Sequence, residues 1–399
     1  MNQIKKIKVE NPIVELDSEQ MSQSVWNIIK KRLIFPFLDV PIKYYDLSIA
    51  QRDKTNNKIT TDAALSIVQH KVGIKCPSLG ADIQMAREFE RIKGWDCPNV
   101  TIGNILNGTL FAQPILIKNI KKVIPNWKNP IIVARQVFQD FISFDEKQVQ
   151  NLELKFTNEK SLKIQDFSST KGSILGFIMY NTEEYMIQFA KDCFEYALEI
   201  KFPLYFSTRA DLYAEYDEKL VQIFQNMYQQ TYKTLFFKKN IIYEHKNNQD
   251  MLIFALKSQG GFVWACKRYD GEIHSQLVSQ GFGNSGLTTN LLFAQQEKAL
   301  YVVSSYFRQQ FQQGKEIYTN AIACIFVWIQ GLLYRGKLDG NQQLISFCQL
   351  LQKSVILCSE NEAFGKELIE EKEKFEVLEK LIESVQKNMI NNLYPKAKL

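Results

Sequence analysis

The sequence predicts an α/β protein, because helix-like and strand-like stretches alternate from the N-terminal part of the chain onward. Apolar side chains recur at helical spacing in residues 20–33 and again in residues 60–70, and strand-like runs occupy residues 42–48 and 72–76. Such alternation is typical of a sheet covered by helices. At 399 residues with 45% hydrophobic content, the chain is long enough for two packed domains.

Two further helices are expected in the C-terminal part. Residues 321–333 form an apolar run that is too short to span a bilayer, so it predicts a buried core helix and no transmembrane segment. Residues 364–389 mix acidic and basic residues with apolar residues at helical spacing. This pattern predicts a packed amphipathic helix, with a helix that docks a partner as the alternative.

Charge and cysteine usage exclude several classes of function. The formal charge of +6 is the difference between 49 basic and 43 acidic residues spread along the chain, so no concentrated field for nucleic acid is expected. Seven scattered cysteines without CxxC spacing predict reduced, mostly buried thiols. The N-terminus shows no targeting presequence, which favours the cytoplasm or a connected compartment. The C-terminal Ala397-Lys398-Leu399 is close to a peroxisomal address, and an ordinary charged tail is the other interpretation.

Three runs of sequence carry a family resemblance. They are the pieces LIFPFLDVPIKYYDLSIAQRD and WDCPNVTIGNILNGTLF in residues 33–111, PLYFSTRADLY from residue 203, and YEHKNNQDM with GGFVWACKRYDGEIHSQ in residues 243–283. The chain resembles the NADP-dependent isocitrate dehydrogenases of the eukaryotic homodimeric type, from about Pro12 to Asn341.

The resemblance implies an isocitrate/isopropylmalate dehydrogenase-like α/β fold with a discontinuous large domain, an inserted small α/β domain and a reduced clasp. On this basis the large domain comprises residues 1–106 and 283–399. The small domain comprises residues 107–139 and 183–282. The reduced clasp, a dimer-forming element in relatives, comprises residues 140–182.

The resemblance also assigns the substrate positions, of which Lys75, Ser78, Asn99 and Arg135 are retained in kind. Arg135 has an alternative role as the ion-pair partner of a local acid such as Asp140. Changed positions are Gly80 for a threonine, Met85 for an arginine, Cys97 for a serine, and Gly103 and Ala112 for two substrate arginines. Losing the charge-assisted hydrogen bonds of two arginines would weaken the binding of a tricarboxylate by about 3 to 6 kcal/mol.

The catalytic positions are changed as well. Ile142 stands at the family's catalytic tyrosine and has no hydroxyl with which to transfer a proton. Arg209 stands at the catalytic lysine, and an arginine stays protonated at any working pH. The resemblance therefore predicts that neither catalytic group is intact.

The metal positions carry Gln249, Glu272 and Gln276, with Asp250 retained beside the first. Glutamine offers only a neutral carbonyl oxygen, whereas Mg²⁺ is normally anchored by carboxylates. No resident metal is expected, and Asp250 and Glu272 are interpreted as ordinary polar residues of a helix and a loop, respectively.

The cofactor positions are Lys257, Thr319 and Asn320, and they are a weak set. The family's His-Gly-Thr phosphate loop does not occur in residues 297–326, where bulky residues stand in its place. Thr319 and Asn320 equally suit the cap of the helix that follows. No cofactor is therefore expected, although NADP with Mg²⁺ or Mn²⁺ would be required if the chain were an active enzyme.

The leading interpretation is a catalytically inactive pseudoenzyme that serves as a structural or interaction subunit of a larger assembly. Two alternatives remain open. One is an NADP-dependent isocitrate dehydrogenase of reduced or altered activity, and the other is a regulatory partner of an active paralogue. The partners implied are thus proteins of an assembly, a second copy in a homodimer, or a paralogue in a heterodimer, with no nucleic acid and no membrane.

Overall fold

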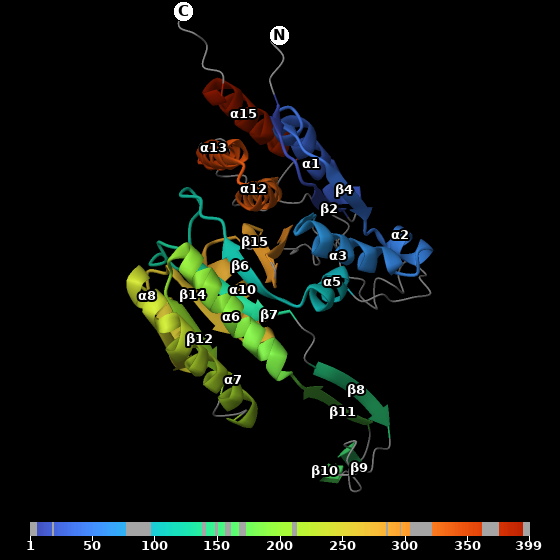
Figure 1. The fold of residues 1–399 in the computed structure, drawn as a ribbon, viewed down its shortest axis with the longest axis vertical. Coiled ribbons are helices and arrows are strands. Elements are labelled where there is room, and N and C mark those ends of the chain that lie inside the picture. Colours follow the sequence, from blue (N-terminus) through green and yellow to red (C-terminus); the bar gives the residue numbers. More distant parts are fainter. Residues whose placement is uncertain are drawn as a thin grey trace, which may run out of the picture. The chain divides into compact units, whose positions relative to one another are not determined.

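The structure is a computed structural model, and Figure 1 shows its fold. It describes residues 6–17, 20–76, 97–137, 141–147, 151–155, 161–166, 173–209, 214–284, 286–295, 297–303, 321–360 and 375–393. The chain divides into two compact units, one made of Met1–Phe138 with Met186–Leu399 and the other of Gln139–Tyr185.

The first unit is built on one ten-stranded mixed sheet, which confirms the predicted α/β class. Across the sheet the order is β13 (Tyr243–Asn247), β12 (Leu204–Thr208), β14 (Phe262–Cys266), β7 (Ile131–Gln136), β6 (Gly108–Pro114), β15 (Thr288–Ala294), β16 (Lys298–Val303), β5 (Val72–Lys75), β2 (Ile13–Asp17) and β4 (Ile42–Asp46). The first four strands are mutually parallel, as are the last four. Antiparallel pairing through β6 and β15 joins these two parallel sets.

Helices from the two ends of the chain pack together over the β5 and β16 side of the sheet. They are α1 (Gln20–Ile29) with the π-helix η1 (Lys30–Ile34), α12 (Ala321–Leu338), α13 (Gln342–Ser359) and α15 (Phe375–Leu393). Their shared core includes the tilted pair Trp26 and Trp328, whose ring centroids lie 5.5 Å apart. The termini therefore contribute to one core (Figure 1).

Both predicted C-terminal helices form. By length and composition α12 resembles a membrane span, but its side chains are mostly buried inside the protein, as the prediction of a core helix requires. The described part of the amphipathic helix is α15, which buries Leu378, Leu381 and Val385 at helical spacing. Its apolar face is thus packed within the chain.

The other half of the sheet is covered on both faces. One face carries α6 (Glu183–Ile200), α7 (Ala214–Met227), the π-helix η2 (Tyr228–Tyr232) and α8 (Lys233–Lys239), around a cluster of aromatic rings centred on Phe194. The opposite face carries α9 (Asn248–Lys257) and α10 (Arg268–Gly281). Because both faces are covered, every residue of β14, FVWAC, is buried.

The described residues of this unit also form the helices α2 (Ile49–Lys54), α3 (Lys58–His70) and α5 (Pro98–Leu106). The short strands β1 (Ile7–Lys8) and β3 (Leu38–Asp39) form a separate parallel pair. Residues 304–320, which hold Thr319 and Asn320, and residues 77–96, which hold Ser78, Gly80 and Met85, lie outside the described residues.

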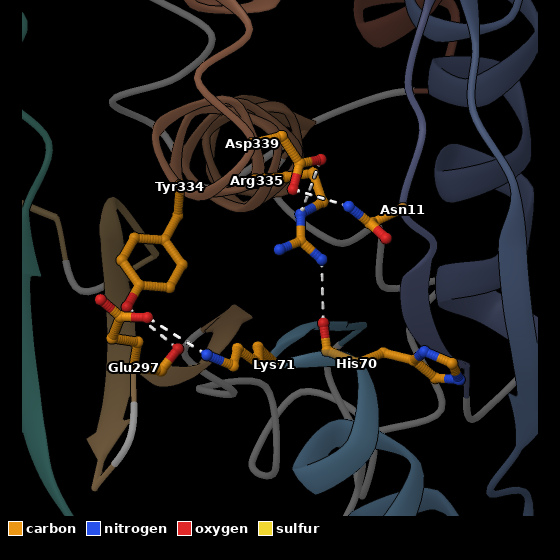
Figure 2. A network of polar contacts seen from close by, with 7 residues as sticks. All are labelled: Asn11, His70, Lys71, Glu297, Tyr334, Arg335 and Asp339. Atoms are coloured by element: carbon orange, nitrogen blue, oxygen red, sulfur yellow. Dashed lines mark hydrogen bonds and ion pairs between the residues drawn. The ribbon is translucent and has the colours of Figure 1, made fainter.

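A polar network ties the end of α12 to distant segments of the chain (Figure 2). Arg335 donates from Nη1 to the carbonyl oxygen of His70 at 2.9 Å, which satisfies a carbonyl at the C-terminal end of α3. Its Nε lies 3.3 Å from Asp339, which in turn accepts from Asn11 at 2.9 Å. The network therefore joins the N-terminal segment, α3 and α12.

The second unit contains two antiparallel strand pairs. Strand β8 (Phe141–Lys147) pairs with β11 (Ser173–Met179), with Ile142 opposite Ile178, and β9 (Asn151–Lys155) pairs with β10 (Ser161–Asp166). This unit covers the region predicted as the reduced clasp. The division of the first unit into large and small domains at the predicted boundaries stays a prediction.

Candidate functional site

A cavity of about 380 Å³ opens against the middle of the sheet, and we call it the front cavity. Strands β6, β7, β15 and β16 form its floor, and the first turn of α5 and one side of α10 form its walls. The polar side chains that line it are those of Asn99, Arg135, Arg268, Glu272, Ser275, Gln276 and Asn290. Asn99, Arg135, Glu272 and Gln276 are thus four predicted site residues that the fold brings together.

Arg135 and Glu272 face one another in this cavity. Arg135 lies near the end of β7, and its Nη1 is 3.2 Å from Oε1 of Glu272 on α10. Gly271 permits the approach, since a Cβ at that position would lie 2.6 Å from Cβ of Arg135. The described partner of Arg135 is therefore supplied from a distant part of the sequence by α10, which packs on β7, while Asp140, the local acid considered from the sequence, lies outside the described residues.

Burial is the main influence on the Arg135 guanidinium. It lowers the pKa of Arg135, the carboxylate of Glu272 opposes that shift, and the charge of Arg268 adds to it. Two buried polar atoms of the cavity have no hydrogen-bond partner among the described residues: Nε of Arg135 and Oδ1 of Asn99. A buried donor and a buried acceptor are thus available to a ligand.

Gly103 and Ala112, the positions predicted to lack substrate arginines, lie in close apolar packing. A Cβ at Gly103 on α5 would overlap Cγ1 of Val137, so no side chain fits there without movement of the valine. Ala112 of β6 is 4% exposed and belongs to the same apolar cluster as Trp127 and Trp264. Neither position has room for an arginine in this packing.

The remaining substrate position in the described residues is Lys75, at the end of β5. Its side chain is fully buried and donates from Nζ to the carbonyl oxygen of Cys76 at 3.2 Å. Ser78 lies outside the described residues. Lys75 is not among the described residues that line the front cavity, although its strand neighbour Val302 is.

At the catalytic positions, Arg209 follows the end of β12 and Ile142 lies in β8 of the second unit. The backbone N–H of Arg209 donates to Oδ2 of Asp217 at 2.7 Å. Oδ1 of the same carboxylate lies 2.7 Å from Nζ of Lys267, and both side chains are buried. This ion pair was missed from the sequence, although Lys267 stands inside the WACK motif, because its partner lies on another helix.

Asp270 belongs to the same charged group. Burial is the main cause that raises the pKa of Asp270, while Lys267 lowers it, Asp217 raises it and Arg209 lowers it. The group is therefore a set of mutually compensating charges at the ends of β12 and β14.

The predicted metal positions lie on two helices, α9 and α10. Gln249 and Asp250 are exposed in the first turn of α9, whereas Glu272 and Gln276 lie one turn apart on α10. Glu272 is thus in a helix, which corrects the expected loop, because Asp270 and Gly271 already belong to α10. In the described part of the chain, no three His, Cys, Asp or Glu side chains are grouped to hold a metal ion. Among these positions Glu272 and Asp250 carry carboxylates, whereas Gln249 and Gln276 offer neutral amide oxygens, which are weaker ligands for Mg²⁺ or Mn²⁺.

Lys257, the described cofactor position, is exposed in the last turn of α9. His274 is buried, stacks on Trp264 with ring centroids 4.3 Å apart, and has Nδ1 3.3 Å from Sγ of Cys266. Burial lowers the pKa of His274 to about 4 and raises that of the Cys266 thiol. This pair is therefore neutral at pH 7, unlike an activated thiolate.

Comparison with known proteins identifies the family. A family model described as isocitrate/isopropylmalate dehydrogenase matches residues 8–377. The mitochondrial NADP isocitrate dehydrogenase of Mus musculus is 41% identical over 375 residues, which cover 91% of this chain and 83% of that protein. The cytoplasmic enzyme of Dictyostelium discoideum is 41% identical over 377 residues, 92% and 91% of the two chains. The peroxisomal enzyme of Candida tropicalis is 41% identical over 367 residues, 89% of each. The chain therefore belongs to the isocitrate/isopropylmalate dehydrogenase family, among proteins similar to the eukaryotic NADP isocitrate dehydrogenases.

Proposed function

We propose that this isocitrate dehydrogenase-like chain is a pseudoenzyme, inactive toward isocitrate and retained as a structural or interaction subunit. The observation that carries the proposal is the Arg135–Glu272 ion pair inside the front cavity. In this pair Arg135, at a predicted substrate position, is bound to Glu272, at a predicted metal position. Both groups are consequently occupied in the absence of ligand.

The chemistry of the remaining positions supports the same proposal. Magnesium would have to be held by Gln276, a neutral ligand, and by a Glu272 that already neutralises Arg135. Arg209 keeps its proton at working pH and is thus unsuited to proton transfer. The oxidation and decarboxylation of a hydroxy acid require both charge stabilisation and proton transfer.

The direct test is an assay of NADP reduction with isocitrate and Mg²⁺ or Mn²⁺, beside thermal unfolding with the same ligands. We expect turnover at the level of the no-enzyme control and no shift in Tm. A ligand present at about one hundred times its Kd would stabilise the fold by about 2.7 kcal/mol, which is readily measured. Turnover above the control, or a clear Tm shift that requires both NADP and metal, would refute the pseudoenzyme.

The proposed partner is a second copy of this chain or a paralogue. Apolar side chains stand exposed on two helices of one sheet face: Ile253 and Leu256 on α9, and Ile273 and Leu277 on α10, each between 41% and 52% exposed. The α10 pair is spaced i, i+4, so it forms a stripe along the helix. Apolar stripes of this kind are typical of helices that pair across an interface. We place this assembly in the cytoplasm or a connected compartment.

A second candidate is an NADP-dependent isocitrate dehydrogenase of reduced or altered activity, as in the alternative drawn from the sequence. It is favoured by identities of about 41% to proteins named as such enzymes. The front cavity also retains Asn99 and Arg135 with unpartnered buried atoms. If the assay detects turnover, Arg135→Ala should abolish it, whereas turnover that persists in Arg135→Ala would exclude the front cavity as its site.

A further inference from the structure

A second cavity, also of about 380 Å³, lies on the opposite face of the same sheet, and we call it the back cavity. Side chains alternate between the two faces of a strand, and the linings follow this alternation. Leu291 and Phe293 of β15 and Tyr301 of β16 line the back cavity. Their neighbours Leu292 and Leu300 line the front cavity. The two cavities are therefore separate sites that share strands.

The walls of the back cavity are mostly apolar. They come from the last turns of α6, from α12 and from α13, with Ile200, Ile329, Leu333 and Ile356 among the lining side chains. The volume lies within the range of small-molecule pockets, which combine an apolar lining with a few polar groups. An apolar body of a small molecule would therefore gain free energy by leaving water for this space.

A polar group in this lining lacks a described partner. Oε1 of Gln330 is buried without a hydrogen-bond partner among the described residues, and Nε2 of Gln330 makes only a long 3.4 Å contact to Oε1 of Gln113. The side chains of Tyr196 and Tyr301, both about 8% exposed, line the same cavity and carry hydroxyl groups. A buried acceptor without a partner is costly unless a bound molecule satisfies it.

The charges of the lining cancel. Glu199 and Lys337 are the charged residues among the described lining, and they pair with each other, Oε1 to Nζ, at 2.7 Å. Burial and the nearby Glu199 carboxylate raise the pKa of Tyr196 and Tyr301, so both phenols remain protonated donors. The described lining therefore offers no unpaired charge to an ionic ligand and does offer hydrogen bonds to a neutral one.

We propose that the back cavity binds an uncharged, largely apolar small molecule that carries a hydroxyl group. The hydroxyl group donates to Oε1 of Gln330 and accepts from a tyrosine hydroxyl, while the apolar body packs against α12, α13 and β15. One hydroxyl group supplies both a donor for Gln330 and an acceptor for a tyrosine hydroxyl. The site does not depend on whether the front cavity is catalytic.

The test compares 1-naphthol with 1-methylnaphthalene, which has a similar shape but no hydroxyl group. Binding to the full chain is measured by titration calorimetry and by isoleucine methyl NMR. We expect saturable binding of 1-naphthol with a Kd below about 1 mM. Methyl signals of Ile329 and Ile356 should shift, whereas that of Ile102, in the core beside Leu292 on the front side, should not.

The variant Gln330→Leu keeps the size of the side chain and removes the acceptor. It should lower the affinity of 1-naphthol relative to 1-methylnaphthalene by about twofold to tenfold, the effect of one hydrogen bond. The control Gln276→Leu, in the front cavity, should leave that ratio unchanged. If Gln330→Leu does not fold, the parent's methyl shifts decide the question.

Three results would overturn the proposal. One is the absence of saturable 1-naphthol binding, and another is a shift confined to Ile102. The third is a folded Gln330→Leu variant with the parent's affinity ratio.

Discussion

Nη1 of Arg135 on β7 lies 3.2 Å from Oε1 of Glu272 on α10 in the front cavity. The chain's own carboxylate is therefore paired with the guanidinium that a carboxylate ligand would bind. The Glu272 side chain is about half exposed, at 48%, whereas Arg135 is 17% exposed. Ion pairs with an exposed member contribute at most about 1 kcal/mol, so Glu272 acts mainly as a competitor and as a repelling charge.

The variant Glu272→Gln should therefore increase the affinity of the front cavity for a tricarboxylate. Removing the competing charge frees Arg135 and ends the repulsion of an anion, and we expect isocitrate to bind about tenfold more tightly, corresponding to about 1.4 kcal/mol. Titration calorimetry without metal measures this. The control is Glu244→Gln on β13, which also breaks a half-exposed ion pair, with Lys246. Equal isocitrate affinities in the parent and Glu272→Gln would show that Arg135 is not limited by Glu272.

Gly103 offers a test of the apolar packing at a former arginine position. Alanine favours a helix by about 1 kcal/mol over glycine, but its Cβ would overlap Val137. We expect Gly103→Ala to lower the free energy of unfolding by about 1 to 3 kcal/mol. In Gly103→Ala with Val137→Ala, the space for the new methyl group is restored, so the two costs should not add.

Chemical denaturation of the four proteins measures this cycle. A coupling of at least about 0.5 kcal/mol between the two substitutions supports the overlap. If Gly103→Ala instead stabilises the protein, then α5 and Val137 move apart freely and the position could accept a larger side chain.

The α/β architecture was predictable because its signals are local. Strand β14 is buried on both faces, and its run FVWAC is apolar throughout, while α12 carries the longest apolar run in a helical context. The family motifs predicted the isocitrate dehydrogenase-like fold, whereas the division into large and small domains stays a prediction. The charged pairs of the site were not predictable, because Arg135 with Glu272 and Asp217 with Lys267 join elements distant in sequence.

Asp192 predicts a pH dependence of stability that comes from outside the front cavity. This carboxyl on α6 is buried and accepts hydrogen bonds from Thr109 at 2.8 Å and Gln188 at 2.5 Å. Burial raises the pKa of Asp192 from 3.8 to about 7, and those two hydrogen bonds oppose the shift. Because the folded state holds this proton more tightly, its contribution to stability is full below pH 3.8 and is lost as the pH rises through 7.

The variant Asp192→Asn keeps a neutral side chain at every pH. Relative to the parent, it should gain on the order of 2 to 3 kcal/mol of stability between pH 5 and pH 8. Thermal unfolding at both pH values measures the difference. Asp62→Asn, an exposed aspartate on α3, is the matched control. A Tm difference between Asp192→Asn and the parent that does not change with pH would contradict a buried, titrating Asp192.

The exposed apolar stripe on α10 gives the last prediction. Ile273 and Leu277 are 51% and 41% exposed, so a second copy that covers the exposed half of each side chain would gain about 1 kcal/mol per side chain. The double variant Ile273→Gln and Leu277→Gln should therefore weaken self-association by about a hundredfold or more, with little change in the stability of the monomer. Sedimentation velocity over a range of concentrations measures the association.

The matched control replaces Leu65 and Val68 of α3, which are 53% and 37% exposed, by Gln, and it should associate as the parent does. A parent that stays monomeric at tens of micromolar, or equal association of the parent and the α10 variant, would remove this stripe as the interface.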